Sequence, residues 1–337
     1  MEYARGAPAR ERTHTIEWLT LALIFGCYGL WFAGGTGLWR LSPLLGFATV
    51  VLTIAFHSSL QHEVLHGHPT RSAALNEALV FCSLGMVFPY RRYKRMHLQH
   101  HADERLTDPY DDPESYYRAL ADWERLPGWL KILLAWNNAL LGRMTIGPAL
   151  MAAGFAISEF RLLRANRRGV RRAWVLHGAG LVPVFVIVTT EFSMPLWAYF
   201  AAAYCGLSLL SVRTFCEHQW TERTDGRTII VERSLLSLLF LNNNLHIVHH
   251  KMPGVAWYRL PSLYRRQRQE WQTINGGYVF PNYLAILRAY GLKPKEPVIH
   301  PVLRRTPTAG RAFRPRRFKL GVHSGIGATV PTEAPKE

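Results

Sequence analysis

Cysteine is scarce in this chain, with only four residues in 337, and the spacing excludes the common cysteine-based metal sites. Cys27, Cys82, Cys205 and Cys216 form no C-x-x-C pair, so neither a zinc ribbon nor an iron–sulfur cluster is indicated. Cys27 and Cys205 also fall within long apolar runs, which argues against a disulfide framework. Any metal or redox chemistry must therefore depend on other side chains.

Acidic residues are also few, because 23 Asp and Glu face 40 Lys and Arg, for a formal net charge of +17. Such an excess is typical of nucleic-acid-binding proteins, but its location here argues against that function. The basic residues crowd just outside the apolar runs, at Arg5, Arg10, Arg12, Arg164, Arg167, Arg168, Arg171 and Arg172. The two short turns between paired runs hold only Arg40. This positive-inside pattern places the N-terminus, the middle segment and the C-terminal third in the cytoplasm.

Four apolar runs interrupt this basic chain, at residues 16–35, 44–60, 173–192 and 194–212. Each is near the roughly 20 residues that a helix needs to cross a bilayer. The first run is too long for a signal-peptide core, and no small-residue cleavage site follows it. We expect an all-α integral membrane protein with four transmembrane helices in two hairpins. The alternative is a set of buried core helices in a large soluble protein.

The remaining segments suggest a cytoplasmic helical cap on the membrane helices. We expect a polar lead-in at 1–15, a single membrane domain with its cap at 16–300, and a basic, disordered tail at 301–337. Within the cap, the moderately apolar segments 78–90 and 129–160 resemble interfacial or re-entrant helices. Residues 213–300 are predicted to be helical, with loops at 224–226 and 275–277.

Three histidine clusters dominate the chain. They are His62-Glu-Val-Leu-His66, His97-Leu-Gln-His100-His101 and His246-Ile-Val-His249-His250. Positions i, i+3 and i+4 share one face of a helix, so each His-x-x-His-His triplet is predicted to direct three imidazoles toward one spot. Every cluster falls at or near a predicted membrane exit on the same side.

Imidazole is the commonest protein ligand for transition metals. Nine histidines are candidate metal ligands: His62, His66, His97, His100, His101, His218, His246, His249 and His250. Nine ligands are too many for one ion and suit two neighbouring ions with four or five nitrogens each. A nitrogen-rich site favours iron or copper over calcium or magnesium, which prefer oxygen.

These motifs resemble the membrane fatty acid desaturases and related hydroxylases. That family has an H-x(3–4)-H box, an H-x-x-H-H box and a late H-x-x-H-H box, and this chain matches all three. His218, after the fourth apolar run, matches a further single histidine of the family. The resemblance covers roughly residues 16–265. Some relatives use an asparagine as an extra ligand, for which Asn242, Asn243 and Asn244 are candidates.

The resemblance implies a diiron centre that uses O2 to desaturate a lipid acyl chain carried on a phospholipid, coenzyme A or acyl carrier protein. Hydroxylation or ketolation of a lipid, alkane or carotenoid is the alternative outcome. The chain has no flavin, haem or iron–sulfur motif. Electrons are therefore expected from a ferredoxin, a rubredoxin or a cytochrome b5-like protein, which the basic cytoplasmic face would attract.

Nearby carboxylates are candidates for orienting the imidazoles through their second ring nitrogens. They are Glu63, Asp103, Asp108, Asp111, Asp112 and Glu217. Among the remaining histidines, His57 and His177 are expected to be packed within spans, and His68 to lie near the ligands without binding metal. His14, His300 and His323 are expected to be solvated.

Two other functions remain open. His62-Glu63-Val-Leu-His66 is also the H-E-x-x-H signature of zinc metalloproteases, in which Glu63 would be the general base. A metal transporter is the second alternative, although transporters place their ligands near the bilayer midplane. The basic segment 90–96 is expected to be a solvated, lipid-facing surface, or alternatively a dock for an anionic carrier.

Overall fold

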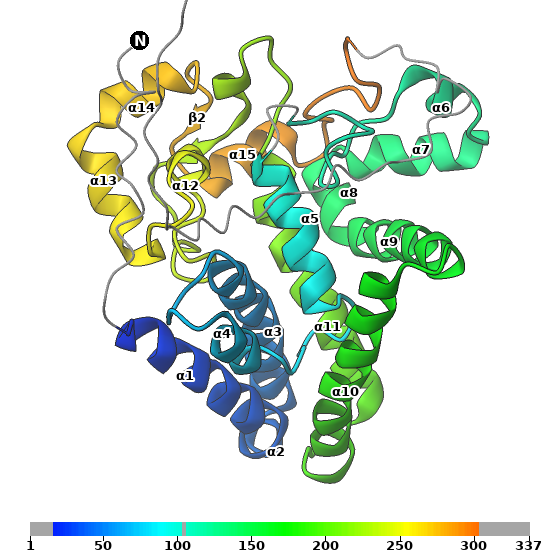
Figure 1. Cartoon of the computed structure of the whole chain (residues 1–337), viewed down its shortest axis with the longest axis vertical. Coiled ribbons are helices and arrows are strands. Elements are labelled where there is room, and N and C mark those ends of the chain that lie inside the picture. Colours follow the sequence, from blue (N-terminus) through cyan, green and yellow to red (C-terminus); the bar gives the residue numbers. More distant parts are fainter. Residues whose placement is uncertain (1–15, 103–105, 303–337) are drawn as a thin grey trace, which may run out of the picture.

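Four long helices form the lower part of the protein, in a computed structural model that describes residues 16–102 and 106–302 (Figure 1). They are α1 (Trp18–Gly35), α3 (Pro43–Leu65), α10 (Arg168–Thr190) and α11 (Leu196–Cys216). All four are long and apolar enough to cross a membrane, which confirms the predicted spans. The lead-in 1–15 and almost all of the tail 301–337 lie outside the described residues.

The first hairpin turns at Gly34, Gly35 and Gly37, between α1 and α3. The short helix α2 (Gly37–Leu41) lies in this turn. Ser42 caps α3 by accepting a hydrogen bond from Leu45 N, and Pro43 occupies its first position. Both residues are typical of a helix start. Helix α3 runs to Leu65, five residues beyond the expected end at 60, because the apolar pattern fades before the hydrogen-bonded helix ends. His62 therefore lies on α3 itself.

Close helix packing holds the hairpins together. Helix α1 packs on α3, and α3 packs on α11, around a core that includes Ile24, Ile54 and Tyr199. A Cβ atom at Gly206 would lie 2.8 Å from Cγ2 of Ile54, so the glycine permits the close approach of α11 to α3. Small residues at such crossings are typical of helices packed in a membrane.

The segment expected as a helix at 78–90 is mostly irregular, so that prediction was wrong. Helix α4 (Ala73–Leu79) ends before it and α5 (Tyr90–Ala102) begins after it. Side chains of the spans supply the hydrogen bonds that a helix would otherwise make: Gln61 donates to Val80 O, and Tyr199 donates to Leu84 O. Buried backbone carbonyls need such partners, and a sequence does not reveal partners from distant helices.

The segment 129–160 also differs from the prediction, because it is divided among three helices. They are α7 (Gly128–Asn137), α8 (Leu140–Thr145) and α9 (Gly147–Arg164), and α6 (Leu120–Glu124) precedes them. The junctions are tight, since a Cβ atom at Gly142 would lie 1.8 Å from Trp136 O. Large apolar side chains on α7 and α9 are exposed, including Trp129, Ile132 and Phe160, as expected for interfacial helices.

Beyond α11 the chain is largely irregular, which corrects the prediction of a helical segment at 213–300. The order is η2 (Thr224–Arg227), β1 (Ile230–Val231), α12 (His246–Lys251), η3 (Trp257–Arg259), α13 (Leu260–Arg266), α14 (Arg268–Ile274), β2 (Val279–Phe280) and α15 (Tyr283–Tyr290). Strands β1 and β2 pair in parallel, with Ile230 opposite Val279. The loop at 275–277 is confirmed, with positive φ at Gly276 and Gly277, whereas 224–226 lies in a 3₁₀ turn.

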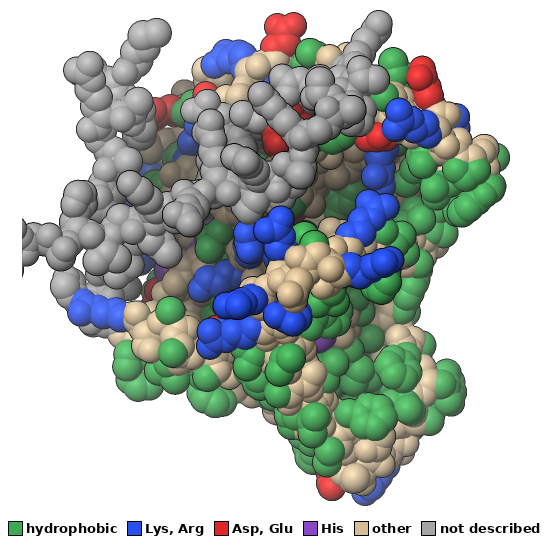
Figure 2. Space-filling model, turned by 45° about the vertical axis from the view of Figure 1, so that its right-hand side comes forward, with side chains coloured by type: hydrophobic (Ala, Val, Ile, Leu, Met, Phe, Trp, Pro, Cys, Tyr) green, Lys and Arg blue, Asp and Glu red, His purple; other side chains and the backbone are tan. Residues whose placement is uncertain are grey.

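Figure 2 shows Lys and Arg side chains gathered in a band between the largely hydrophobic lower part of the protein and the cap. Arg164, Arg167, Arg168 and Arg171, around the α9–α10 junction, are exposed. The basic residues near the third span therefore lie on the surface, as the charge pattern predicts.

Candidate metal centre

All nine candidate ligands come together between the spans and the cap. His62 is in the last turn of α3, and His66 follows it. Helix α5 carries His97, His100 and His101, His218 follows α11, and α12 carries the last cluster. Their ring nitrogens divide into a five-histidine group (His62, His66, His97, His101 and His249) and a four-histidine group (His100, His218, His246 and His250). Within each group, one ring nitrogen per residue lies within 4.8 Å of every other.

Each His-x-x-His-His triplet is shared between the two groups, which corrects the prediction that a triplet faces one spot. On α5, His97 and His101 join the five-histidine group, while His100 joins the other. On α12, His246 and His250 join the four-histidine group, while His249 joins the other. The reason is helical geometry: at about 100° per residue, position i+4 is rotated about 40° one way from i, and i+3 about 60° the other way.

The nitrogens of the four-histidine group converge closely. Nε2 of His218 lies 2.9 Å from Nε2 of His100 and 3.0 Å from Nε2 of His246, and His246 lies 3.1 Å from His250 through the same atoms. Two nitrogens bound at right angles to one ion, at about 2.1 Å each, would be about 3 Å apart. The spacing therefore suits a common transition-metal ion.

The five-histidine group contains buried nitrogens that lack a hydrogen-bond partner among the described residues. They include Nε2 of His62, His66 and His97. Buried polar atoms without partners are costly, and a metal ion would satisfy all three. The neutral imidazole donors, with no carboxylate in either group, fit iron or copper better than calcium or magnesium.

The second nitrogens of several imidazoles have fixed partners. Nδ1 of His100 lies 2.8 Å from Asp112, as the sequence suggested, and Nδ1 of His97 lies 2.8 Å from Glu114, which the sequence analysis missed. Carboxylate partners of this kind orient metal-binding histidines. The only sequence signal for Glu114 was its position two residues after Asp112.

The three asparagines before α12 make hydrogen bonds within the protein. Asn243 Oδ1 lies 3.0 Å from Nδ1 of His246, and its amide donates to Glu217. Asn242 and Asn244 donate to backbone carbonyls of Trp257 and Val231. Asn243 therefore orients a candidate ligand, and Glu217 holds Asn243 in place.

Electrostatics differ between members of the centre. Burial and neighbouring imidazoles lower the pKa of His249 and His250 well below the usual range and that of His101 to about 2, which favours the neutral form that binds metal. For His100, burial acts in the same direction, but Glu114 and Asp112 outweigh it and raise the pKa to about 9. These carboxylates stabilise a positive charge at His100. A bound metal cation would also provide a positive charge at this position.

Glu63 does not orient a candidate ligand. It belongs to a separate buried group with Glu17 and His68. Its carboxylate accepts a hydrogen bond from Trp257 N at 3.0 Å, while Nδ1 of His68 lies 2.6 Å from Glu17. This group joins the start of α1 to the segment after α3. The H-E-x-x-H glutamate is thus committed to structural contacts, unlike a protease base.

For the histidines that were not expected to bind metal, the structure confirms some predictions and corrects another. His57 and His177 are buried and hydrogen-bonded, to Tyr28 and to Met86 O respectively. His300 is 4% exposed against the rings of Tyr117 and Trp220, so the prediction that it is solvated was wrong. A backbone bridge between Arg118 and Ile299 brings it there.

Asp108 caps its own loop by accepting hydrogen bonds from the backbone N–H groups of Tyr110 and Asp111. Asp103, His14 and His323 lie outside the described residues.

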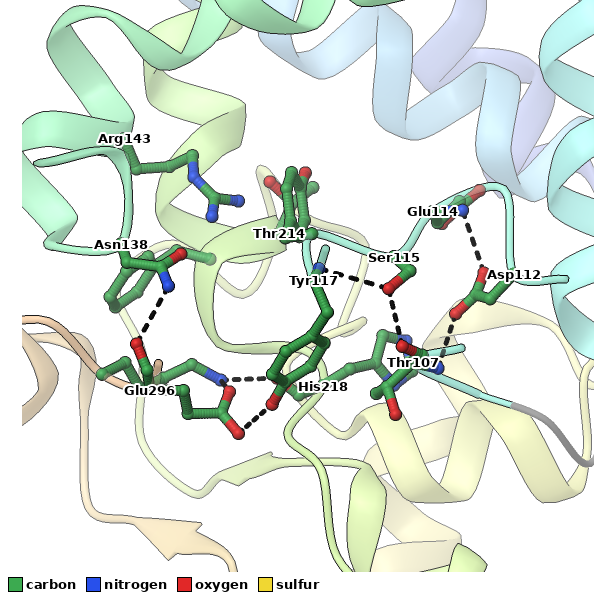
Figure 3. Close-up of a pocket in the computed structure, with 13 residues that line it drawn as sticks. Thr107, Asp112, Glu114, Ser115, Tyr117, Asn138, Arg143, Thr214, His218 and Glu296 are labelled. Atoms are coloured by element: carbon green, nitrogen blue, oxygen red, sulfur yellow. Dashed lines mark hydrogen bonds and ion pairs between the residues drawn. The ribbon is translucent and has the colours of Figure 1, made fainter. Parts of the chain in front are cut away.

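A cavity with several polar and charged side chains in its wall adjoins the four-histidine group (Figure 3). Its volume is about 40 Å³, and His218, Asp112 and Glu114 form part of its wall. Arg143 of α8 extends into it from the side opposite Asp112 and Glu114 (Figure 3). The cavity therefore reaches from the candidate metal ligands into the cap.

Comparison with known proteins agrees with the geometry of the centre. No curated protein matches the chain. The family model described as fatty acid desaturase matches residues 38–282. The match covers well over half of the chain and includes all nine candidate histidine ligands. The protein therefore belongs to the fatty acid desaturase family.

Proposed function

We propose that the protein is an O2-dependent lipid oxidase that desaturates an acyl chain at a diiron centre. The five-histidine group would hold one iron and the four-histidine group the other. The observation that carries the proposal is the division of nine imidazoles, five of them buried and four partly buried, into two adjacent groups with converging nitrogens. Two iron ions would supply the redox chemistry that side chains alone lack.

The chain's own residues position and isolate this centre. Glu114, Asp112 and Asn243 orient His97, His100 and His246 through their Nδ1 atoms. Five of the nine candidate ligands are buried, and His62, His100 and His246 among them are at most 3% exposed, so much of the centre is shielded from bulk water. Dry, fixed surroundings favour controlled oxidation because reactive species are kept from solvent.

The reaction also needs a substrate route and an electron source. Removal of two hydrogens from an alkyl chain by O2 consumes two external electrons and two protons, and forms two waters. The four apolar helices would give a lipid acyl chain access from the bilayer. An external donor such as a ferredoxin, a rubredoxin or a cytochrome b5-like protein would dock on the basic side, which we assign to the cytoplasm.

Hydroxylation or ketolation remains the alternative outcome of the same centre. The product depends on whether the oxidised carbon loses a second hydrogen or gains oxygen. Neither the protease nor the transporter function accounts for two histidine groups at the membrane edge.

The test combines metal and product analysis. Detergent-purified protein from iron-supplemented cells is expected to contain about two irons per chain, and His100→Ala or His249→Ala to contain fewer. Lipids from cells that express the protein are expected to gain double bonds, and those from cells with either variant are not. About one zinc per chain would overturn the proposal, and hydroxylated or keto lipids would select the alternative outcome.

A further inference from the structure

The cavity beside His218 contains a buried positive charge without a counter-ion among the described residues. Arg143 is 4% exposed, and its Nη1 atom has no hydrogen-bond partner. Its Nε atom donates to Asn137 O at 3.0 Å, and its guanidinium carbon lies 3.5 Å from the centre of the Tyr116 ring. These contacts fix the guanidinium but do not neutralise it. A buried guanidinium stays protonated, and isolation from a counter-ion is costly.

The other charged groups in the cavity wall are already paired. Lys295 Nζ lies 2.9 Å from Glu296 and also donates to His218 O. Asp112 and Glu114 face the imidazoles of His100 and His97. Figure 3 shows the two carboxylates well apart from Arg143. Among the described residues, Arg143 is therefore the charged group of this wall for which no partner of opposite charge is found.

Two further polar atoms of the wall lack partners among the described residues. They are Oγ1 of Thr107 and Nδ1 of His218. With Nη1 of Arg143, the atoms of the wall that lack partners therefore include a charged N–H donor and a hydroxyl, and both match an oxygen acceptor.

We propose that this cavity binds a carboxylate group, with Arg143 as counter-ion and with Thr107 in the wall as a further hydrogen-bond partner. A guanidinium matches a carboxylate through paired hydrogen bonds. The volume of about 40 Å³ exceeds the roughly 10–15 Å³ that one water needs, so the cavity has room for more than a single water. The two unpartnered groups, Nη1 of Arg143 and Oγ1 of Thr107, match the two oxygens of a carboxylate better than the four of a phosphate. The carboxylate belongs either to a free small acid or to the end of an alkyl chain.

The test is equilibrium dialysis of full-length, detergent-purified protein against radiolabelled acetate, octanoate or inorganic phosphate. No metal is added, so the result does not depend on the proposed oxidation. Saturable binding of acetate or octanoate is expected, with weaker or no binding of phosphate. Tighter binding of octanoate would identify an alkyl carboxylate as the ligand, and equal or tighter binding of acetate would identify a small free acid.

Variants assign the binding to the cavity. Arg143→Met is expected to weaken carboxylate binding about 10- to 100-fold through loss of the charged hydrogen bonds. Thr107→Val removes only the orphan hydroxyl and is expected to weaken binding about 3- to 10-fold. Arg143→Lys keeps the charge and should bind better than Arg143→Met. Thr273→Val, which removes an exposed hydroxyl on α14, is the matched control.

Two results would overturn the proposal. One is absence of saturable acetate and octanoate binding, which would mean that the cavity holds water only. The other is unchanged binding in Thr107→Val together with unchanged binding in whichever Arg143 variant folds. In either case, the iron content of the wild-type protein would still test the proposed function, because it is measured separately.

Discussion

At the scale of single residues, the centre depends on the groups behind the imidazoles. A neutral histidine binds metal through one nitrogen, and the partner of its second nitrogen fixes the tautomer and the ring orientation. Glu114 has this role for His97, in the five-histidine group. The imidazoles of His97 and His100 outweigh the effect of burial and hold the pKa of Glu114 below its usual range, so its carboxylate is charged at neutral pH.

Glu114→Gln tests this role. The amide keeps the size of the side chain but loses the negative charge that strengthens the bond to His97 Nδ1. Metal affinity at the five-histidine group is expected to fall about 10- to 100-fold, measured by cobalt titration of the purified protein. Glu124→Gln, on the exposed side of α6, is the control. Equal affinity in both variants would show that Glu114 does not support the site.

At the scale of elements, α3 combines two tasks. Its apolar length suits a membrane span, and its last turn carries His62. Its position depends on close contact with the preceding turn at Gly46. A Cβ atom at Gly46 would lie 2.6 Å from Trp39 Cα and 2.7 Å from Gly34 O. Both are backbone atoms, so the hairpin would have to open to admit a side chain.

Gly46→Ala is therefore expected to destabilise the protein by about 1–3 kcal/mol, the usual cost of overpacking. The measurement is thermal unfolding in detergent. Gly26→Ala in α1 is the matched control, because nothing lies within 4 Å of a Cβ atom there, and it is expected to be neutral or slightly stabilising. Equal melting temperatures for the two variants would contradict the assigned close packing.

At the scale of the whole molecule, the metal centre joins segments that are far apart in the chain. The candidate ligands come from α3 and the residue after it, from α5, from the segment after α11 and from α12, so bound metal would connect the spans to the cap. A ligand that binds only the folded protein stabilises it by about 4 kcal/mol at a concentration 1,000 times its dissociation constant. The irregular cap, with its short helices, should benefit most.

Addition of ferrous iron under anaerobic conditions is accordingly expected to raise the melting temperature of metal-free protein. The rise should shrink strongly in His246→Ala. It should persist in Lys251→Ala, which removes an exposed side chain from the same helix. A rise of equal size in His246→Ala would show that the stabilising metal binds elsewhere.

The sequence by itself determined the membrane spans and the identity of the candidate ligands. Both depend on local information: uninterrupted apolar length fixes a span, and the spacing of histidines such as His97, His100 and His101 is visible in one helical turn. The resemblance to the desaturases depended on the same local motifs, and the family match confirms it.

Only the tertiary structure decided how those residues combine. It divided each triplet between two groups, placed Glu114 behind His97, and directed Glu63 to Trp257 and His68. It also left Arg143 buried beside the centre without a counter-ion among the described residues. The physical reason is that hydrogen-bond partners, ion pairs and irregular backbone depend on contacts between distant segments, whereas helical length and periodicity depend on neighbours in the chain.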